Sequence, residues 1–229
     1  MMHVAISVPD ENLETWLETI ADLANLRTVE LSLHTLTQAT AALRQAARQG
    51  VQVISARELL PGEIGRHFES VPAKVLADAT STLAGKFGPL RQAGVEFASL
   101  DLGLRVATGT VEEEGVDERV KFLKRIVMPC NEQHLKLCLA VRYPPERPQS
   151  NPWRVAANIV HETMHPACRL AVDFFPYEAG PRFDVSEFLR GCGFHLGLVR
   201  FHYEPMLGDE LTEEHVLAWA RALRWHGFK

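Results

Sequence analysis

The stretch L-G-L-V-R-F-H-Y-E, residues 196–204, has the pattern of a buried strand that ends in polar side chains. On the two-residue period of a strand, three apolar or aromatic residues share one face: Val199, Phe201 and Tyr203. The opposite face carries Leu198 and then a cation, an imidazole and a carboxylate: Arg200, His202 and Glu204. Such a strand end is unusual for a strand that only packs. The stretch therefore predicts a functional site at its carboxyl end.

Six other short apolar runs precede this strand, and amphipathic helical patterns separate them. The seven predicted strands are 3–8, 28–33, 51–56, 95–102, 135–141, 169–174 and 196–204. Regular alternation of strands and helices indicates parallel strands joined by right-handed crossovers. Seven or eight such units in this length fit an α/β fold of the (β/α) TIM-barrel type better than a doubly wound sheet. No G-x-G-x-x-G follows the first strand, and no break in composition divides residues 1–229, so we predict one barrel domain.

The eighth strand of such a barrel would begin near Gly227, where the sequence runs out. We therefore predict a stub or missing eighth strand. The seam between strands seven and one is then open, or is covered by another chain in a homo-oligomer.

Composition narrows the class of protein. The chain has 46% hydrophobic and 23% charged residues and a net charge of −5, which argues against nucleic-acid binding. No apolar run approaches the roughly 20 residues that a membrane span needs, so we expect no membrane association and a cytoplasmic location. The four cysteines show no C-x-x-C spacing and are expected to be buried free thiols: Cys130, Cys138, Cys168 and Cys192.

Chemistry in barrels of this type sits at the carboxyl ends of the strands. The polar residues predicted there, in strand order, are Ser7, Glu30, Ser32, His34, Ser55, Arg57, Asp101, Arg142, Asp173, Arg200, His202 and Glu204. One interpretation is a structural ion network, in which arginines are neutralised by carboxylates: Arg142 and Arg200 by Asp101, Asp173 and Glu204. The other is a polar small-molecule site. Several arginines in one mouth favour an anionic ligand, because a guanidinium binds phosphate or carboxylate through two hydrogen bonds.

One motif suggests a different chemistry. His161-Glu162-Thr163-Met164-His165 matches the H-E-x-x-H pattern of zinc metalloproteases. Pro166 ends the helix directly after the second histidine, and no further histidine ligand follows at the usual spacing. We therefore keep a zinc protease only as a remote alternative to an outer helix with exposed histidines.

Three segments resemble a known superfamily. H-P-A-C-R-L-A-V-D-F-F-P, residues 165–176, resembles strand six of the xylose isomerase-like barrels, which include sugar phosphate isomerases, epimerases and endonuclease IV. Residues 198–229 resemble strand seven, the glycine-containing loop and the last helix of that superfamily, and T-V-E-L-S-L, residues 28–33, is similar to its strand two with an inward glutamate. The resemblance implies a TIM barrel. It also implies a divalent-metal site of two glutamates, an aspartate and a histidine that supports proton transfer between adjacent sugar carbons.

This chain keeps only part of that pattern. Asp173 matches the strand-six position, and His202 and Glu204 are candidate metal ligands from strand seven. Arg142 stands near the position of the strand-five glutamate, and the strand-eight glutamate has no counterpart. An arginine among the ligands repels a cation. We therefore expect a degraded metal site that binds Mn, Mg or Zn, or no metal at all.

The leading hypothesis is an isomerase or epimerase that acts on a sugar or sugar phosphate. Its catalytic residues would be Asp173 or Glu204 as base and His202 as partner acid. Arg142 and Arg200 would hold the ligand and stabilise enediolate charge, with substrate contacts from Glu30, His34, Arg57 and Asp101. The alternative is a catalytically inert barrel that binds an anionic metabolite through Arg142 and Arg200, or that serves as a structural subunit.

Overall fold

The computed structural model describes residues 5–22, 27–104, 116–143, 152–174, 185–201 and 213–227. Seven strands form one sheet in chain order, and every neighbouring pair is parallel. They are β1 (Ile6–Ser7), β2 (Thr28–Ser32), β3 (Gln52–Arg57), β4 (Phe97–Leu100), β5 (Lys136–Tyr143), β6 (Cys168–Phe174) and β7 (Leu196–Phe201). The predicted α/β barrel class is confirmed.

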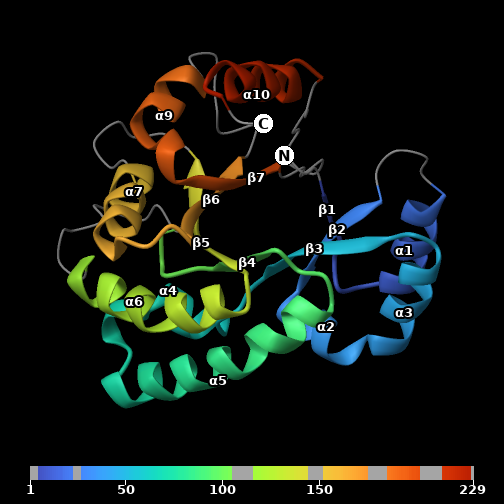
Figure 1. The fold of residues 1–229 in the computed structure, drawn as a ribbon, viewed down its shortest axis with the longest axis horizontal. Coiled ribbons are helices and arrows are strands. Elements are labelled where there is room, and N and C mark those ends of the chain that lie inside the picture. The colour runs from blue at the N-terminus through green and yellow to red at the C-terminus, as the bar shows by residue number, and fades with distance from the viewer. Residues whose placement is uncertain are drawn as a thin grey trace.

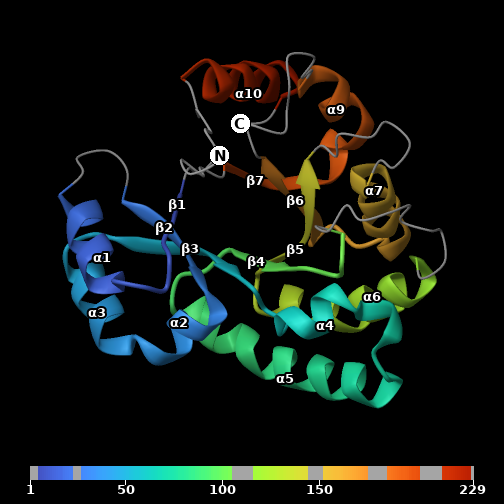
Figure 2. The same cartoon turned by 180° about the vertical axis from the view of Figure 1, so that it is seen from behind.

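Helices cover the outside of the sheet, which curls around an interior (Figures 1 and 2). They are α1 (Leu13–Ala21), α2 (Leu33–Gln38), α3 (Thr40–Arg48), α4 (Gly62–Arg66), α5 (Ala73–Gln92), α6 (Val116–Glu132), α7 (Pro152–Thr163), α9 (Val185–Cys192) and α10 (Glu213–Trp225), with 3-10 turns η1 (Phe68–Ser70) and η2 (Gly193–His195). In the described part of the chain, no helix has the length and apolar content that crossing a membrane requires.

The sheet is a curled, incomplete barrel. It ends at β1 on one side and β7 on the other, and no ladder pairing joins these two strands among the residues described. Among the described residues there are seven strands and no eighth, which agrees with the predicted stub or missing eighth strand. Whether another chain covers the seam stays a prediction.

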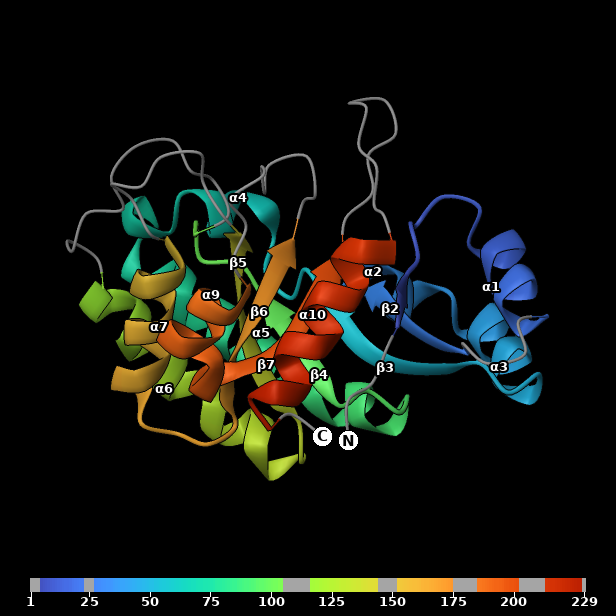
Figure 3. The same ribbon diagram turned by 90° about the horizontal axis from the view of Figure 1, so that it is seen from above.

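Two apolar clusters hold the helices to the sheet. The larger lies between β3–β7 and helices α5, α6, α7, α9 and α10. There Trp219 of α10 packs edge-on against Phe174 and Phe188, with ring centroids 5.6 and 5.7 Å apart. The smaller cluster joins β1 and β2 to α1 and α3. These two helices stand to one side of the molecule in Figure 3. The outward residues of the strands thus supply the core, as expected for parallel strands covered by helices.

Three of the cysteines are buried free thiols, as predicted. Burial raises the pKa of Cys138 and of Cys168 to about 12. These groups therefore act as small apolar side chains. The side chain of Cys192 lies outside the described part.

The end of β2 differs from the prediction. The strand stops at Ser32, whose hydroxyl accepts a hydrogen bond from the Thr35 backbone N–H and so caps α2. His34 consequently lies on the first turn of α2, where it is exposed, and not on an inward strand position. The segment after β3 contains two short helical turns, α4 and η1.

Asp10 joins β1 to this helix cap. Its Oδ1 accepts hydrogen bonds from the hydroxyls of Ser32 and Thr35. Partial burial raises the pKa of Asp10, but these hydrogen bonds and the positive charge of Arg57 outweigh it, so the pKa lies below the ordinary value of 3.8. The Asp10 carboxylate therefore links the segment after β1 to the β2–α2 junction and to Arg57 at the end of β3.

Replacing Asp10 with Asn should make stability less dependent on pH. A depressed carboxyl pKa stabilises the fold above pH 3.8, and this contribution is lost as the pH falls through the folded-state value. We expect D10N to lower the urea midpoint at pH 7 and to converge with the parent once the pH falls below the folded-state pKa of Asp10. The side chain is 40% exposed, so the shift should be small. The exposed neighbour variant Glu11→Gln should leave the profile unchanged; an equal response from both variants would contradict this role.

Two helical glycines offer a matched test of packing. A Cβ on Gly191 in α9 would lie 2.6 Å from the ring of Trp153, which is buried against Phe188. A Cβ on Gly85 in α5 would meet no atom within 4 Å. We expect Gly191→Ala to lower the free energy of unfolding by about 1–3 kcal/mol and Gly85→Ala to raise it by up to about 1 kcal/mol. Chemical denaturation measures the free energy of unfolding of both variants. A higher value for Gly191→Ala as well as for Gly85→Ala would contradict the close contact between Gly191 and Trp153.

Candidate active site

The inner face of the curled sheet carries small and polar side chains, together with a small apolar cluster of Phe97, Cys138, Ala171 and Leu198. Since alternate residues point outward into the apolar core, the intervening positions face the interior. Five of these are small and almost fully buried: Ser55, Ser99, Cys138, Ala140 and Ala171. Most TIM barrels fill this space with bulky branched residues. Here the small residues leave room for longer charged side chains.

A buried ion triad occupies this interior. The Nε of Arg200 on β7 donates to Glu30 Oε1 on β2 at 2.9 Å, and its Nη1 donates to Asp173 Oδ1 on β6 at 3.0 Å. Ser55 on β3 also donates to Glu30 Oε1, at 2.7 Å. The three charged residues are 3% (Glu30), 1% (Asp173) and 6% (Arg200) exposed. The strand alternation of the sequence predicted that these side chains would converge, and they do.

The Arg200–Glu30 pair also spans the opening of the sheet. β2 and β7 stand near opposite ends of the strand order and share no ladder hydrogen bonds. The side-chain pair connects them through the interior, between residues 170 positions apart. The triad therefore links strands that lie near the two ends of the described sheet.

The charge of Arg200 is fixed by its partners. Burial lowers its pKa, but the carboxylates of Glu30 and Asp173 raise it further, so the pKa lies above the ordinary arginine value. Its remaining terminal nitrogen, Nη2, is buried and has no hydrogen-bond partner among the residues that the structure describes. A buried guanidinium donor of this kind can bind an oxygen of a ligand or of water.

The predicted ion network is therefore only partly correct. Asp173 neutralises Arg200 as expected, but the second carboxylate is Glu30, which the sequence assigned to substrate binding. The carboxylate of Asp101 accepts a hydrogen bond from the Gly103 backbone N–H at the end of β4. Arg142 lies in register with Asp173, and Asp173 with Arg200, in one row across β5, β6 and β7. The side chain of Arg142 and residues His202 and Glu204 lie outside the described part.

A second polar cluster lies at the carboxyl ends of β1 and β3. Arg57 contacts Glu58 Oε1 at 2.6 Å, donates to the Val8 carbonyl at 3.1 Å and lies 3.7 Å from Asp10 Oδ1. Glu58 has a left-handed backbone, with φ of 58°. The sequence predicted Arg57 as a site residue but not Asp10, which directly follows Pro9 after the first strand.

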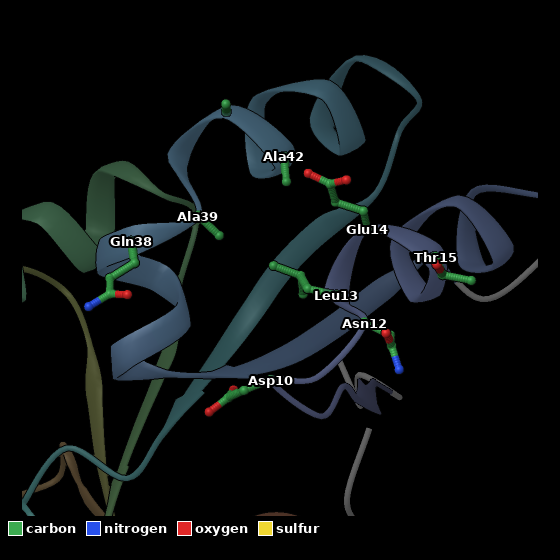
Figure 4. A pocket seen from close by; sticks show the side chains of 9 residues that line it. Asp10, Asn12, Leu13, Glu14, Thr15, Gln38, Ala39 and Ala42 are labelled. Atoms are coloured by element: carbon green, nitrogen blue, oxygen red, sulfur yellow. The ribbon is translucent and has the colours of Figure 1, made fainter.

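A pocket of about 570 Å³ lies beside this cluster. Figure 4 shows it between the start of α1 and the junction of α2 with α3. Its lining mixes carboxylate, amide and small apolar side chains: Asp10, Asn12, Leu13, Glu14, Thr15, Gln38, Ala39, Ala41 and Ala42. No triad residue lines it, so the pocket is separate from the interior site.

The described residues do not form a divalent-metal site. They contain no group of three or more histidine, cysteine, aspartate or glutamate side chains placed to hold an ion. Glu30 and Asp173, the buried carboxylates of the interior, each present an oxygen to Arg200, whose positive charge repels a metal cation. The predicted metal ligands His202 and Glu204 lie outside the residues that the structure describes.

The H-E-x-x-H motif is not arranged as in a zinc protease. α7 ends at Thr163, and Met164 adopts a left-handed backbone with φ of 54°. His165 therefore lies beyond the helix, where its Nδ1 accepts a hydrogen bond from the Ala167 N–H. His161 instead packs edge-on against His195, with ring centroids 5.7 Å apart. The two motif histidines thus do not share a helical face.

Comparison with known proteins identifies the fold. No protein-family model and no curated protein matches this sequence. Among solved structures, a D-psicose 3-epimerase crystallised in the presence of D-fructose matches with a TM-score of 0.72 and 15% identity, over 97% of this chain and 81% of that one. The IOLI protein with a bound zinc atom matches with a TM-score of 0.67 and 15% identity, over 100% and 86%.

A fusion of a xylose isomerase-like TIM barrel with 4-hydroxyphenylpyruvate dioxygenase is similar too, with a TM-score of 0.63 and 18% identity over 96% of this chain and 34% of that one. These identities support a statement about architecture. The chain has the fold of the xylose isomerase-like TIM barrels, with seven strands described.

Proposed function

We propose that the chain is a sugar isomerase or epimerase-type protein that binds a neutral, carbonyl-bearing sugar at the carboxyl end of its sheet. The observation that carries the proposal is the buried Glu30–Arg200–Asp173 triad, with the Nη2 donor of Arg200 unused by the described residues. A fixed guanidinium N–H is suited to a sugar carbonyl or hydroxyl oxygen. The solved epimerases of the same fold, one crystallised with D-fructose present, support this class of ligand.

The charge balance of the triad favours a neutral ligand over an anionic one. Two carboxylates and one guanidinium sum to −2 + 1 = −1, so the triad by itself repels an anion. This revises the expectation that Arg200 would attract phosphate or carboxylate. Binding of a sugar phosphate would depend on additional cations, such as Arg142 in the row beside Asp173 or Arg57 at the end of β3.

The proposed reaction moves a proton next to the carbonyl. Such a step needs a base, a partner acid and a donor that stabilises the enediolate oxygen. Because Asp173 is already committed to Arg200, we assign the base to Glu204 and the acid to His202, which follow Arg200 in the sequence at two-residue spacing. Arg200 is the enediolate donor in this assignment.

A catalytically inert barrel is the second candidate. The observation that favours it is the pairing of Arg200 with two carboxylates, since a purely structural network needs the same contacts. Anion binding through Arg142 and Arg200 is a variant of this candidate, supported by the position of both arginines beside Asp173 in the strand register.

Deuterium exchange distinguishes these candidates. We expect the protein in D₂O to exchange the C–H next to the carbonyl of at least one ketose among D-psicose, D-fructose, D-tagatose and L-ribulose, as followed by proton NMR. Glu204→Gln should slow the exchange by about 10²–10⁴-fold without changing the melting temperature. The control Glu118→Gln, on an exposed helical pair with Lys121, should exchange at the parent rate.

The same panel should include ketose phosphates. Faster exchange of the neutral sugars supports the charge argument, whereas thermal stabilisation by phosphates without exchange supports the inert anion-binding barrel. Absence of exchange from every sugar, neutral or phosphorylated, would overturn the proposed enzyme.

A further inference from the structure

We infer that Arg200 is a built-in cation: its guanidinium takes the charge-balancing place of a divalent ion between Glu30 and Asp173, so the interior site operates without a bound metal. This inference concerns the electrostatics of the interior, and it goes beyond the proposed function because it does not depend on which reaction, if any, the chain catalyses.

The first argument is the geometry of the two carboxylates. Glu30 and Asp173 come from β2 and β6, which are not neighbours in the sheet, yet both contact the same guanidinium within 3.0 Å. Adjacent nitrogens of one planar group hold the two oxygens, so Arg200 is the bridge between these strands. Two buried carboxylates so close together require a cation between them.

The second argument is competition for the same oxygens. A divalent cation binds carboxylate oxygens at about 2.0–2.6 Å and needs several of them. Glu30 Oε1 already accepts from both Arg200 and Ser55, and Asp173 Oδ1 accepts from Arg200. A metal ion at either carboxylate would lie close to a permanent positive charge and would be repelled by it. The guanidinium and a metal ion therefore exclude each other at this position.

The third argument is what the guanidinium still offers. Nε and Nη1 serve the carboxylates, and Nη2 is buried without a hydrogen-bond partner in the described part of the chain. Its N–H groups are donors of fixed direction, held in place on β7. Arg200 can thus bind a ligand oxygen and supply positive polarisation, which are two tasks that a metal ion performs in other sites.

The test measures metal dependence of stability in the full chain. For the parent protein we expect no stoichiometric Mn²⁺ or Mg²⁺ by calorimetry, and a melting temperature that EDTA leaves unchanged. Arg200→Ala removes the cation and should lower the melting temperature by about 10 °C in EDTA. Saturating Mn²⁺ should restore at least half of that loss, with one ion bound per chain.

The matched control is Arg200→Ala combined with Asp173→Asn, which removes one of the two anionic ligands. It should lose the rescue by Mn²⁺. Should Arg200→Ala not fold without metal, Arg200→Lys keeps a cation in place, and it should fold and ignore Mn²⁺, while Arg200→Ala should fold only when Mn²⁺ is added.

Two results would overturn the inference. One is a parent protein that holds a divalent ion whose removal lowers its melting temperature. The other is an Arg200→Ala variant that gains no Mn²⁺ affinity. Because every readout is binding or melting, a failure here is separate from the absence of deuterium exchange that would overturn the proposed enzyme.

Discussion

The pairing of Arg200 with Glu30 and Asp173 is the interaction on which the interior of this protein depends. Each of these charges is almost fully buried, and a buried charge without its partner costs several kcal/mol. The three side chains therefore stabilise the fold only as a set. The set also joins β2 to β7 across the side where the described sheet has no ladder pairing. The same three side chains thus balance the buried charge and connect strands near the two ends of the described sheet.

The remaining inner face is consistent with this arrangement. A long guanidinium and two carboxylates need volume, and the strands supply it through serine, alanine and cysteine at inward positions. Ser55 in addition donates to Glu30, so a small side chain also satisfies a lone pair of the triad. The apolar core lies almost entirely outside the sheet, under the helices. Most of the apolar burial and the polar interior are therefore contributed by opposite faces of the same strands.

The sequence was sufficient to predict the strands and the convergence of Asp173, Arg200 and Glu30, because strand alternation determines which side chains face inward. It could not predict which charges would pair, since Glu30 and Arg200 are 170 residues apart. The expectation of an anionic ligand counted arginines without knowing their partners. His34 was misplaced for a local reason: Ser32, one residue before the expected end of the strand, caps a helix.

Motif and geometry lead to different conclusions in this chain. H-E-x-x-H is the sharpest motif in the sequence, but one left-handed residue, Met164, removes the second histidine from the helix that the motif requires. The triad has no motif at all, because its members belong to three strands. What brings them together is the register of parallel strands, in which equal depth along the sheet matters and sequence spacing does not. In a barrel of this kind, the chemistry must be sought from strand register and charge balance before local motifs are considered.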